Sequence, residues 1–61
     1  MLNSERVKEI TIQMYNDYVE ELQVRETLNL GVALVLVGQH PNYGDLALIN
    51  TINGNAACLI L

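Results

Sequence analysis

The chain has 61 residues, a net charge of -4 at pH 7, one cysteine and one histidine. A chain this short forms at most one domain, and folding buries only about 60% of the surface that the unfolded chain exposes. The single cysteine excludes an intrachain disulfide. One cysteine and one histidine are also too few for a zinc site built by one chain, so we expect no metal and no cofactor. Oligomerisation is the remaining way for so small a domain to gain stability.

The charged residues lie almost entirely in the first half of the chain. Nine of the ten occupy positions 5–26, and Asp45 is the only charged residue after Glu26. Three basic residues are too few to neutralise a phosphate backbone, which argues against nucleic-acid binding. No secretory signal is apparent, and the longest apolar run, Val32–Val37, is far shorter than the ~20 residues of a transmembrane helix. We therefore expect a cytoplasmic protein with no transmembrane segment.

The first predicted element is an amphipathic helix over about residues 4–22. Asn3 and Ser4 are good N-cap residues, and Glu5 would favour the positive end of the helix dipole. Apolar side chains then recur at spacings of three and four, a pattern typical of a helix with one buried face: Val7, Ile10, Met14, Tyr18 and Leu22.

Three strands are predicted after the helix, at about residues 30–37, 46–52 and 56–61. Apolar and polar residues begin to alternate within Leu22–Leu30, so the crossover from helix to strand lies in that segment. The two connections are indicated by turn residues, first in Gly38–Asp45 and then at Asn53-Gly54, which favours a type I′ hairpin.

The predicted fold class is therefore α+β, a single small domain over residues 1–61. One N-terminal amphipathic helix packs on a three-stranded antiparallel β-meander, and the fold is completed by homo-oligomerisation. One helix covers only one face of such a sheet, while the other face still carries apolar side chains. We expect a twofold homodimer to bury them, with these candidate interface residues: Val35, Ile49, Cys58, Leu59 and Ile60.

Two further surfaces are candidate binding sites. The turn sequence HPNYGD places imidazole, amide, phenol and carboxylate groups close together in His40, Asn42, Tyr43 and Asp45. An ordinary turn, with Tyr43 packed over its own strand ends, is the alternative interpretation. The second candidate is the acidic helix face, which could bind a basic partner but could equally be a solvated face: Asp17, Glu20 and Glu21.

No catalytic group is predicted. Cys58 and His40 match no nucleophile–base motif, and the apolar neighbours of Cys58 indicate a buried thiol of low reactivity. We therefore expect that the protein is not an enzyme.

The sequence favours a small homo-oligomeric interaction protein that binds and inhibits or modulates a larger protein. Short acidic inhibitors of host systems, of the kind made by phages and mobile elements, have a similar size and composition. One alternative is a protein prenylated at the terminal CLIL, which matches the cysteine–aliphatic–aliphatic–Leu pattern but follows an uncharged segment. Another is a precursor peptide with a helical leader and a C-terminal core.

Overall fold

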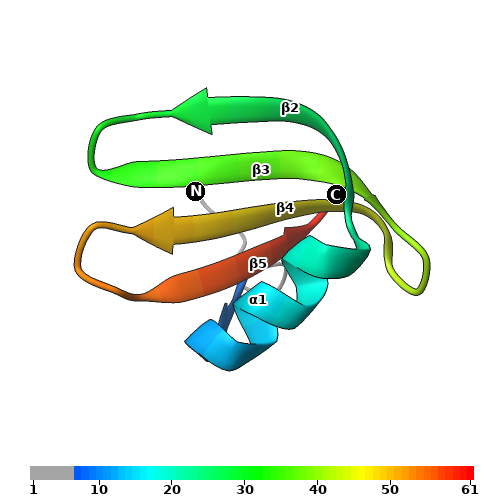
Figure 1. Ribbon diagram of the computed structural model, residues 1–61, viewed down its shortest axis with the longest axis horizontal. Helices are drawn as coiled ribbons and strands as arrows, with labels where there is room; N and C mark the ends of the chain where they lie inside the picture. Colours follow the sequence, from blue (N-terminus) through cyan, green and yellow to red (C-terminus); the bar gives the residue numbers. More distant parts are fainter. Residues whose placement is uncertain (1–6) are drawn as a thin grey trace.

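The computed structural model describes residues 7–61 as a five-stranded antiparallel sheet with one helix against it (Figure 1). The order of strands across the sheet is β1-β5-β4-β3-β2. β2 to β5 therefore form a meander, and β1 pairs with the free side of β5. In chain order the elements are β1 (Val7–Ile10), α1 (Ile12–Glu21), β2 (Gln23–Asn29), β3 (Ala33–His40), β4 (Gly44–Thr51) and β5 (Ala56–Ile60).

The predicted three-stranded meander is wrong, and so is the helix over about residues 4–22. Residues 7–10 form β1, because pairing with β5 outweighs the weak helical pattern of this segment. The helix begins only after Thr11, whose backbone is extended and whose hydroxyl accepts a hydrogen bond of 3.1 Å from the Met14 N–H. The predicted cap residues Asn3 and Ser4 lie outside the described residues.

The segment in which the crossover was predicted is itself a strand. β2 pairs with β3, with a register shift between Val24 and Glu26 that leaves Arg25 in a bulge. All seven residues of β2 are exposed. The alternation of apolar and polar residues in this segment is therefore that of an exposed edge strand. It does not mark the beginning of a buried strand. β3 then starts at Ala33 and continues to His40, three residues beyond the predicted end.

The two later connections fall where turn residues were found, with different details. The first is shorter than Gly38–Asp45, because β3 and β4 pair as far as His40 and Gly44. The second is a hairpin at Asn53-Gly54, in which the N–H of Gly54 donates to the carbonyl of Thr51 at 3.0 Å. In the part of the chain that the structure describes, no residue other than glycine has a positive φ, so this turn is not type I′.

The hydrophobic core lies between α1 and the β4–β5 part of the sheet. Leu46 and Leu48 of β4 are only 1% and 0% exposed. Tyr15 of α1 and Leu22, which follows it, pack against them together with Ala56 and Cys58 of β5. In Figure 1, α1 lies across this side of the sheet, whereas β2 and β3 extend beyond it.

Strand register assigns the side chains to two faces, because successive residues of a strand point to opposite sides. The covered face packs on α1 and includes Leu36, Leu46, Leu48 and Cys58. We call the opposite side the open face, and its apolar side chains are those of Val7, Leu28, Ala33, Val35, Val37, Ala47, Ile49, Ala57 and Leu59. Among residues 7–61, α1 is the only helix, and it packs on the covered face. Thus no described element covers the open face.

Candidate functional site

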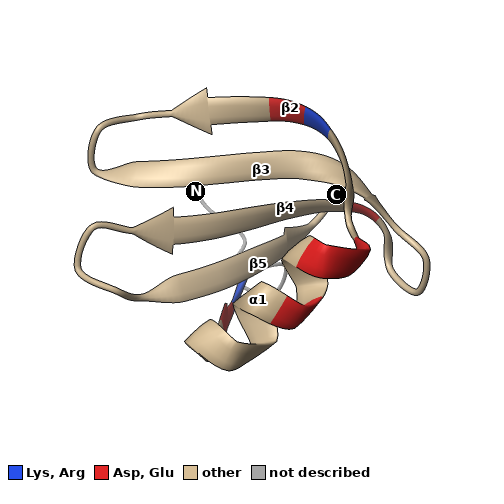
Figure 2. Ribbon diagram, in the orientation of Figure 1, with Lys and Arg blue, Asp and Glu red and all other residues tan. Residues whose placement is uncertain are grey.

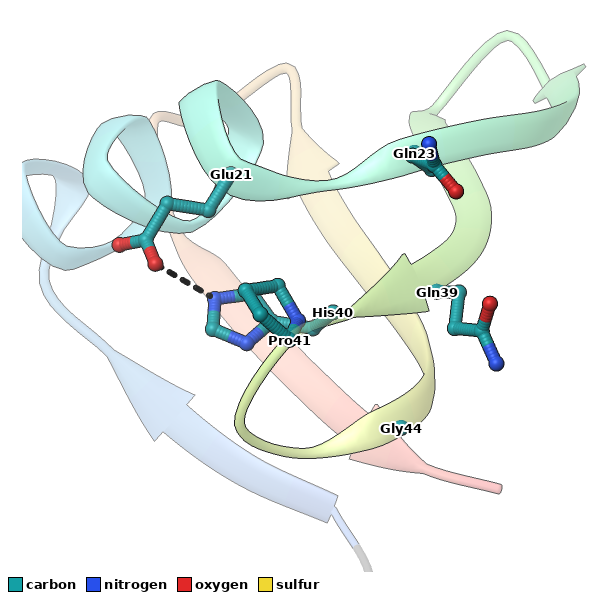
Figure 3. Close-up of a pocket in the computed structure, with 6 residues that line it drawn as sticks. All are labelled: Glu21, Gln23, Gln39, His40, Pro41 and Gly44. Carbon is teal, nitrogen blue, oxygen red and sulfur yellow. Dashed lines mark ion pairs between the residues drawn. The ribbon is translucent and has the colours of Figure 1, made fainter.

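The C-terminal end of α1 meets the β3–β4 turn, and we call this region the polar end. His40, the last residue of β3, lies beside Glu21, the last residue of α1 (Figure 3). The distance between His40 Nε2 and Glu21 Oε2 is 3.7 Å, and the side chain of His40 is 1% exposed, against 50% for that of Glu21. The fold thereby joins two surfaces that the sequence presents separately, the turn and the acidic helix face.

The hydrogen bonds of His40 assign its tautomer. The backbone N–H of Asn42 donates to His40 Nδ1 at 3.1 Å, so Nδ1 carries a lone pair. In a neutral imidazole the hydrogen is then on Nε2. This buried Nε2 has no hydrogen-bond partner. A buried donor without an acceptor is unfavourable, and the nearest carboxylate, that of Glu21, is just beyond bonding distance.

An aromatic cluster fixes the position of His40. The His40 ring lies 5.5 Å from the Tyr18 ring, edge to face, and 5.0 Å from the Tyr43 ring. Tyr18 and Tyr43 also meet edge to face at 5.6 Å. The pKa of Tyr18 is raised above 10.0, first by a hydrogen bond with the Tyr43 side chain and then by burial. The cluster ties the turn to α1, which holds His40 rigidly below Glu21.

A cavity of about 460 Å³ opens beside His40. Figure 3 shows Glu21 at one end of it, His40 and Pro41 in the middle, and two amide side chains at the other end. Those two amides belong to Gln23 and Gln39, which are cross-strand partners in β2 and β3. A carboxylate and two amides therefore line one cavity, and such side chains can bind a polar ligand through an ion pair and hydrogen bonds.

The polar end is negatively charged. The last turn of α1 contains Glu20 and Glu21 and no basic residue, although the helix C-terminus itself favours cations. Figure 2 shows acidic residues at the end of α1 and at the start of β4. There Asp45 forms an ion pair with Arg25 at 3.5 Å, in which both side chains are more than half exposed. The other members of the two predicted surfaces, Asp17 and Asn42, are exposed to solvent.

The five predicted interface residues do not share one face of the sheet. Val35, Ile49 and Leu59 lie on the open face. Cys58 is buried in the core under α1, and Ile60 lies on the same side of β5, 38% exposed. Only the first three can therefore meet another molecule on the open face.

The described residues give Cys58 a structural role. Burial raises the pKa of its thiol, and Lys8 only partly offsets this, so the reactive thiolate form is disfavoured. The side chains near His40 are those of Glu21, Tyr18 and Tyr43, and Cys58 is not one of its hydrogen-bond or ion-pair partners among residues 7–61. Between Val7 and Leu61, no three His, Cys, Asp or Glu side chains are grouped so that they could hold a metal ion.

Sequence reasoning missed the contact of His40 with Tyr18 and Glu21, and the amides of Gln23 and Gln39. Both depend on where the β3–β4 turn folds back relative to α1 and β2. Residue spacing along one segment carries no signal for such a contact.

A comparison with protein-family models, curated proteins and solved structures finds no match for this chain. Within residues 7–61, the helix α1 lacks the length and the apolar character needed to cross a membrane.

Proposed function

We propose that the protein is a small homodimeric interaction protein that binds and modulates a larger protein partner. The observation that supports this most strongly is the open face, where apolar side chains of all five strands form one continuous surface. Contiguous apolar surfaces with polar rims mark protein interfaces in soluble proteins. Here Glu9, Glu26 and Asp45 lie at the rim.

The cross-section of the molecule sets an upper limit on the area of the open face. The molecule measures 27 × 24 × 21 Å, and an ellipse with axes of 27 and 24 Å has an area of about 500 Å². Two molecules stacked through this face would bury at most about 1,000 Å², which is the least that a specific interface usually requires. A second copy of the chain therefore suffices to cover the open face.

The edges of the sheet are poorly suited to the alternative, a continuous sheet made by edge pairing. β1 has only four residues, and Lys8 and Glu9 are two of them. β2 carries Arg25 and Glu26 at a bulge in its ladder. Short edges, charges and bulges are devices that discourage pairing between strand edges. These features favour association through the open face.

The position of Cys58 favours an interaction protein over a protein prenylated at CLIL. A cysteine must be exposed to be prenylated, whereas Cys58 is 6% exposed and lies within β5. The five-stranded sheet likewise favours a folded protein over a precursor peptide whose C-terminal part is processed.

The test is the molar mass in solution, measured by light scattering at concentrations from 5 to 500 µM of the full chain. We expect twice the 6.8 kDa mass of the chain at the upper concentrations. Ile49→Glu places a charge in the centre of the open face and should give a folded monomer. The matched control is Ile52→Glu, in the β4–β5 turn, because Ile52 is 74% exposed and a charge there should leave the dimer intact. A wild-type monomer throughout this range would contradict the proposal.

A further inference from the structure

We propose that the cavity at the polar end binds an arginine-bearing peptide segment of the partner, with Glu21 as the counter-ion of the guanidinium. The inference rests on the proposed partner binding and adds the site and the chemistry of what is bound. Three features of the polar end support it: the shape of the cavity, its charge and the unpartnered nitrogen of His40.

The shape of the cavity suits a short extended peptide. The carboxylate of Glu21 lies at one end and the amides of Gln23 and Gln39 lie at the other (Figure 3). An amide side chain donates and accepts at once, so it matches the N–H and C=O groups of a peptide backbone. A guanidinium on the same peptide would reach the carboxylate, while its backbone lies against the amides.

The charge of the polar end selects a cation. Glu20 and Glu21 stand at the negative end of the α1 dipole, an arrangement that is unfavourable until a positive charge is added. Among residues 7–61 the only lysine and arginine are Lys8 and Arg25, and Arg25 pairs with Asp45. A guanidinium from outside would therefore meet the Glu21 carboxylate, with which neither Lys8 nor Arg25 forms an ion pair. An anionic ligand would be repelled by the same carboxylates.

The third feature is the unpartnered nitrogen of His40, which does not depend on the charge of the polar end. Its Nε2–H is buried, has no hydrogen-bond partner and faces the Glu21 carboxylate at 3.7 Å. A carboxylate has two oxygens, so Glu21 can accept the Nε2–H with Oε2 and bind a guanidinium with Oε1. His40 is then a positioning residue, which holds Glu21 at the mouth of the cavity.

The same tautomer argues against a metal ion as the ligand. A metal binds the lone pair of a neutral imidazole nitrogen, and Nε2 holds its hydrogen because Nδ1 accepts from the N–H of Asn42. Metal binding through Nε2 would therefore break the hydrogen bond that shapes the turn.

The experiment is an NMR titration of the ¹⁵N-labelled full chain with the peptide acetyl-Gly-Arg-Gly-amide. We expect saturable shifts of the Gln23 and Gln39 side-chain amides, with a Kd on the order of 1 mM, as for a small ligand with few anchoring contacts. The Nε2–H of His40 should shift downfield as it forms its hydrogen bond to Glu21. The peptide with citrulline in place of arginine, which is neutral but of similar shape, should bind at least tenfold more weakly.

Glu21→Gln should weaken binding of the arginine peptide at least tenfold. The matched control is Glu20→Gln, which removes the same charge from the same helical turn but does not line the cavity, and should change Kd less than twofold. Equal effects of the two variants would show general electrostatic attraction only and would overturn the site. So would equal binding of the citrulline peptide, or shifts that do not saturate.

The molar mass, measured in the same samples, separates this inference from the proposed function. A dimer that fails to bind the peptide overturns the site and leaves the dimer proposal standing. A monomer that binds the peptide with the expected dependence on Glu21 supports the site and contradicts the dimer.

Discussion

Leu48 and Ile49 are neighbours in β4, yet they lie in opposite environments. Leu48 is 0% exposed, beneath α1, with Cys58 and Leu36 as its cross-strand partners. Ile49 is only half-buried, between Val35 and Ala57 on the open face. The two faces have similar apolar side chains and differ in whether another element covers them. Within residues 7–61, therefore, one face is covered by α1, and the other is apolar without a described element packed on it.

The largest predicted difference between the faces comes from truncating these two neighbours. Leu48→Ala should lower the free energy of unfolding by about 3 kcal/mol, because it leaves a cavity in the closed core. For a chain of this size that is a large part of the total, at ~0.05–0.15 kcal/mol per residue.

Ile49→Ala should cost about 1 kcal/mol under conditions where the chain is monomeric, since its side chain is already partly in water. Urea unfolding followed by circular dichroism at several protein concentrations measures both. A cost for Ile49→Ala that equals that for Leu48→Ala and does not depend on concentration would break the comparison.

Gly38→Ala tests how closely β2 is held against β3. A Cβ at position 38 would lie 2.1 Å from the backbone oxygen of Gln23, so the two strands would have to separate. We expect a loss of about 2–3 kcal/mol, as in overpacked cores. Hydrogen exchange should show the loss of protection concentrated in β2 and β3. Gly54→Ala, at a positive φ of 85° but with open space around it, is the control that tests backbone strain alone.

Thr11→Ala tests how much the N-cap of α1, the helix on the covered face, contributes to stability. The Thr11 hydroxyl caps α1 through the N–H of Met14, and its removal should cost about 1 kcal/mol. Thr11→Ser keeps the hydroxyl and should restore most of the stability in thermal unfolding. A loss of the same size for Thr11→Ser would assign the effect to packing of the methyl group.

Alkaline pH should lower the stability of the protein by ionising two buried groups of the covered face, the Cys58 thiol and the Tyr15 hydroxyl. Burial raises the pKa of the Cys58 thiol above 9.0 and that of the Tyr15 hydroxyl above 10.0, the latter partly offset by a hydrogen bond with Asn50. The folded state therefore holds these protons more tightly than the unfolded state, and the stability they give is present below pH 9 and lost as the pH rises through the folded-state values. Urea midpoints from pH 7 to 11 measure this decline. In Cys58→Ala the decline in stability should begin at a higher pH. An unchanged profile would contradict the assignment of the first part of the decline to the Cys58 thiol.

The sequence pattern predicts the strands β3 to β5 better than it predicts the elements in the first half of the chain. Turn residues at Pro41 and Asn53-Gly54 mark the β3–β4 and β4–β5 hairpins, because the conformational preferences of these residues are local. β1 and β2 were missed, since β1 depends on pairing with a segment almost fifty positions later and β2 is exposed on both sides. The same applies to the candidate site. The turn residues are visible in the sequence, but the contact between His40 and Glu21 exists only once the sheet is formed.

The measurement that tests the central claim most directly is a set of isotope-filtered NMR contacts in a mixed sample of labelled and unlabelled chains. We expect contacts between molecules among the methyl groups of Val35, Ile49 and Leu59, and none to Leu48 under α1. A sample in which these open-face methyl groups contact only their own chain would contradict the claim that this face binds a second copy.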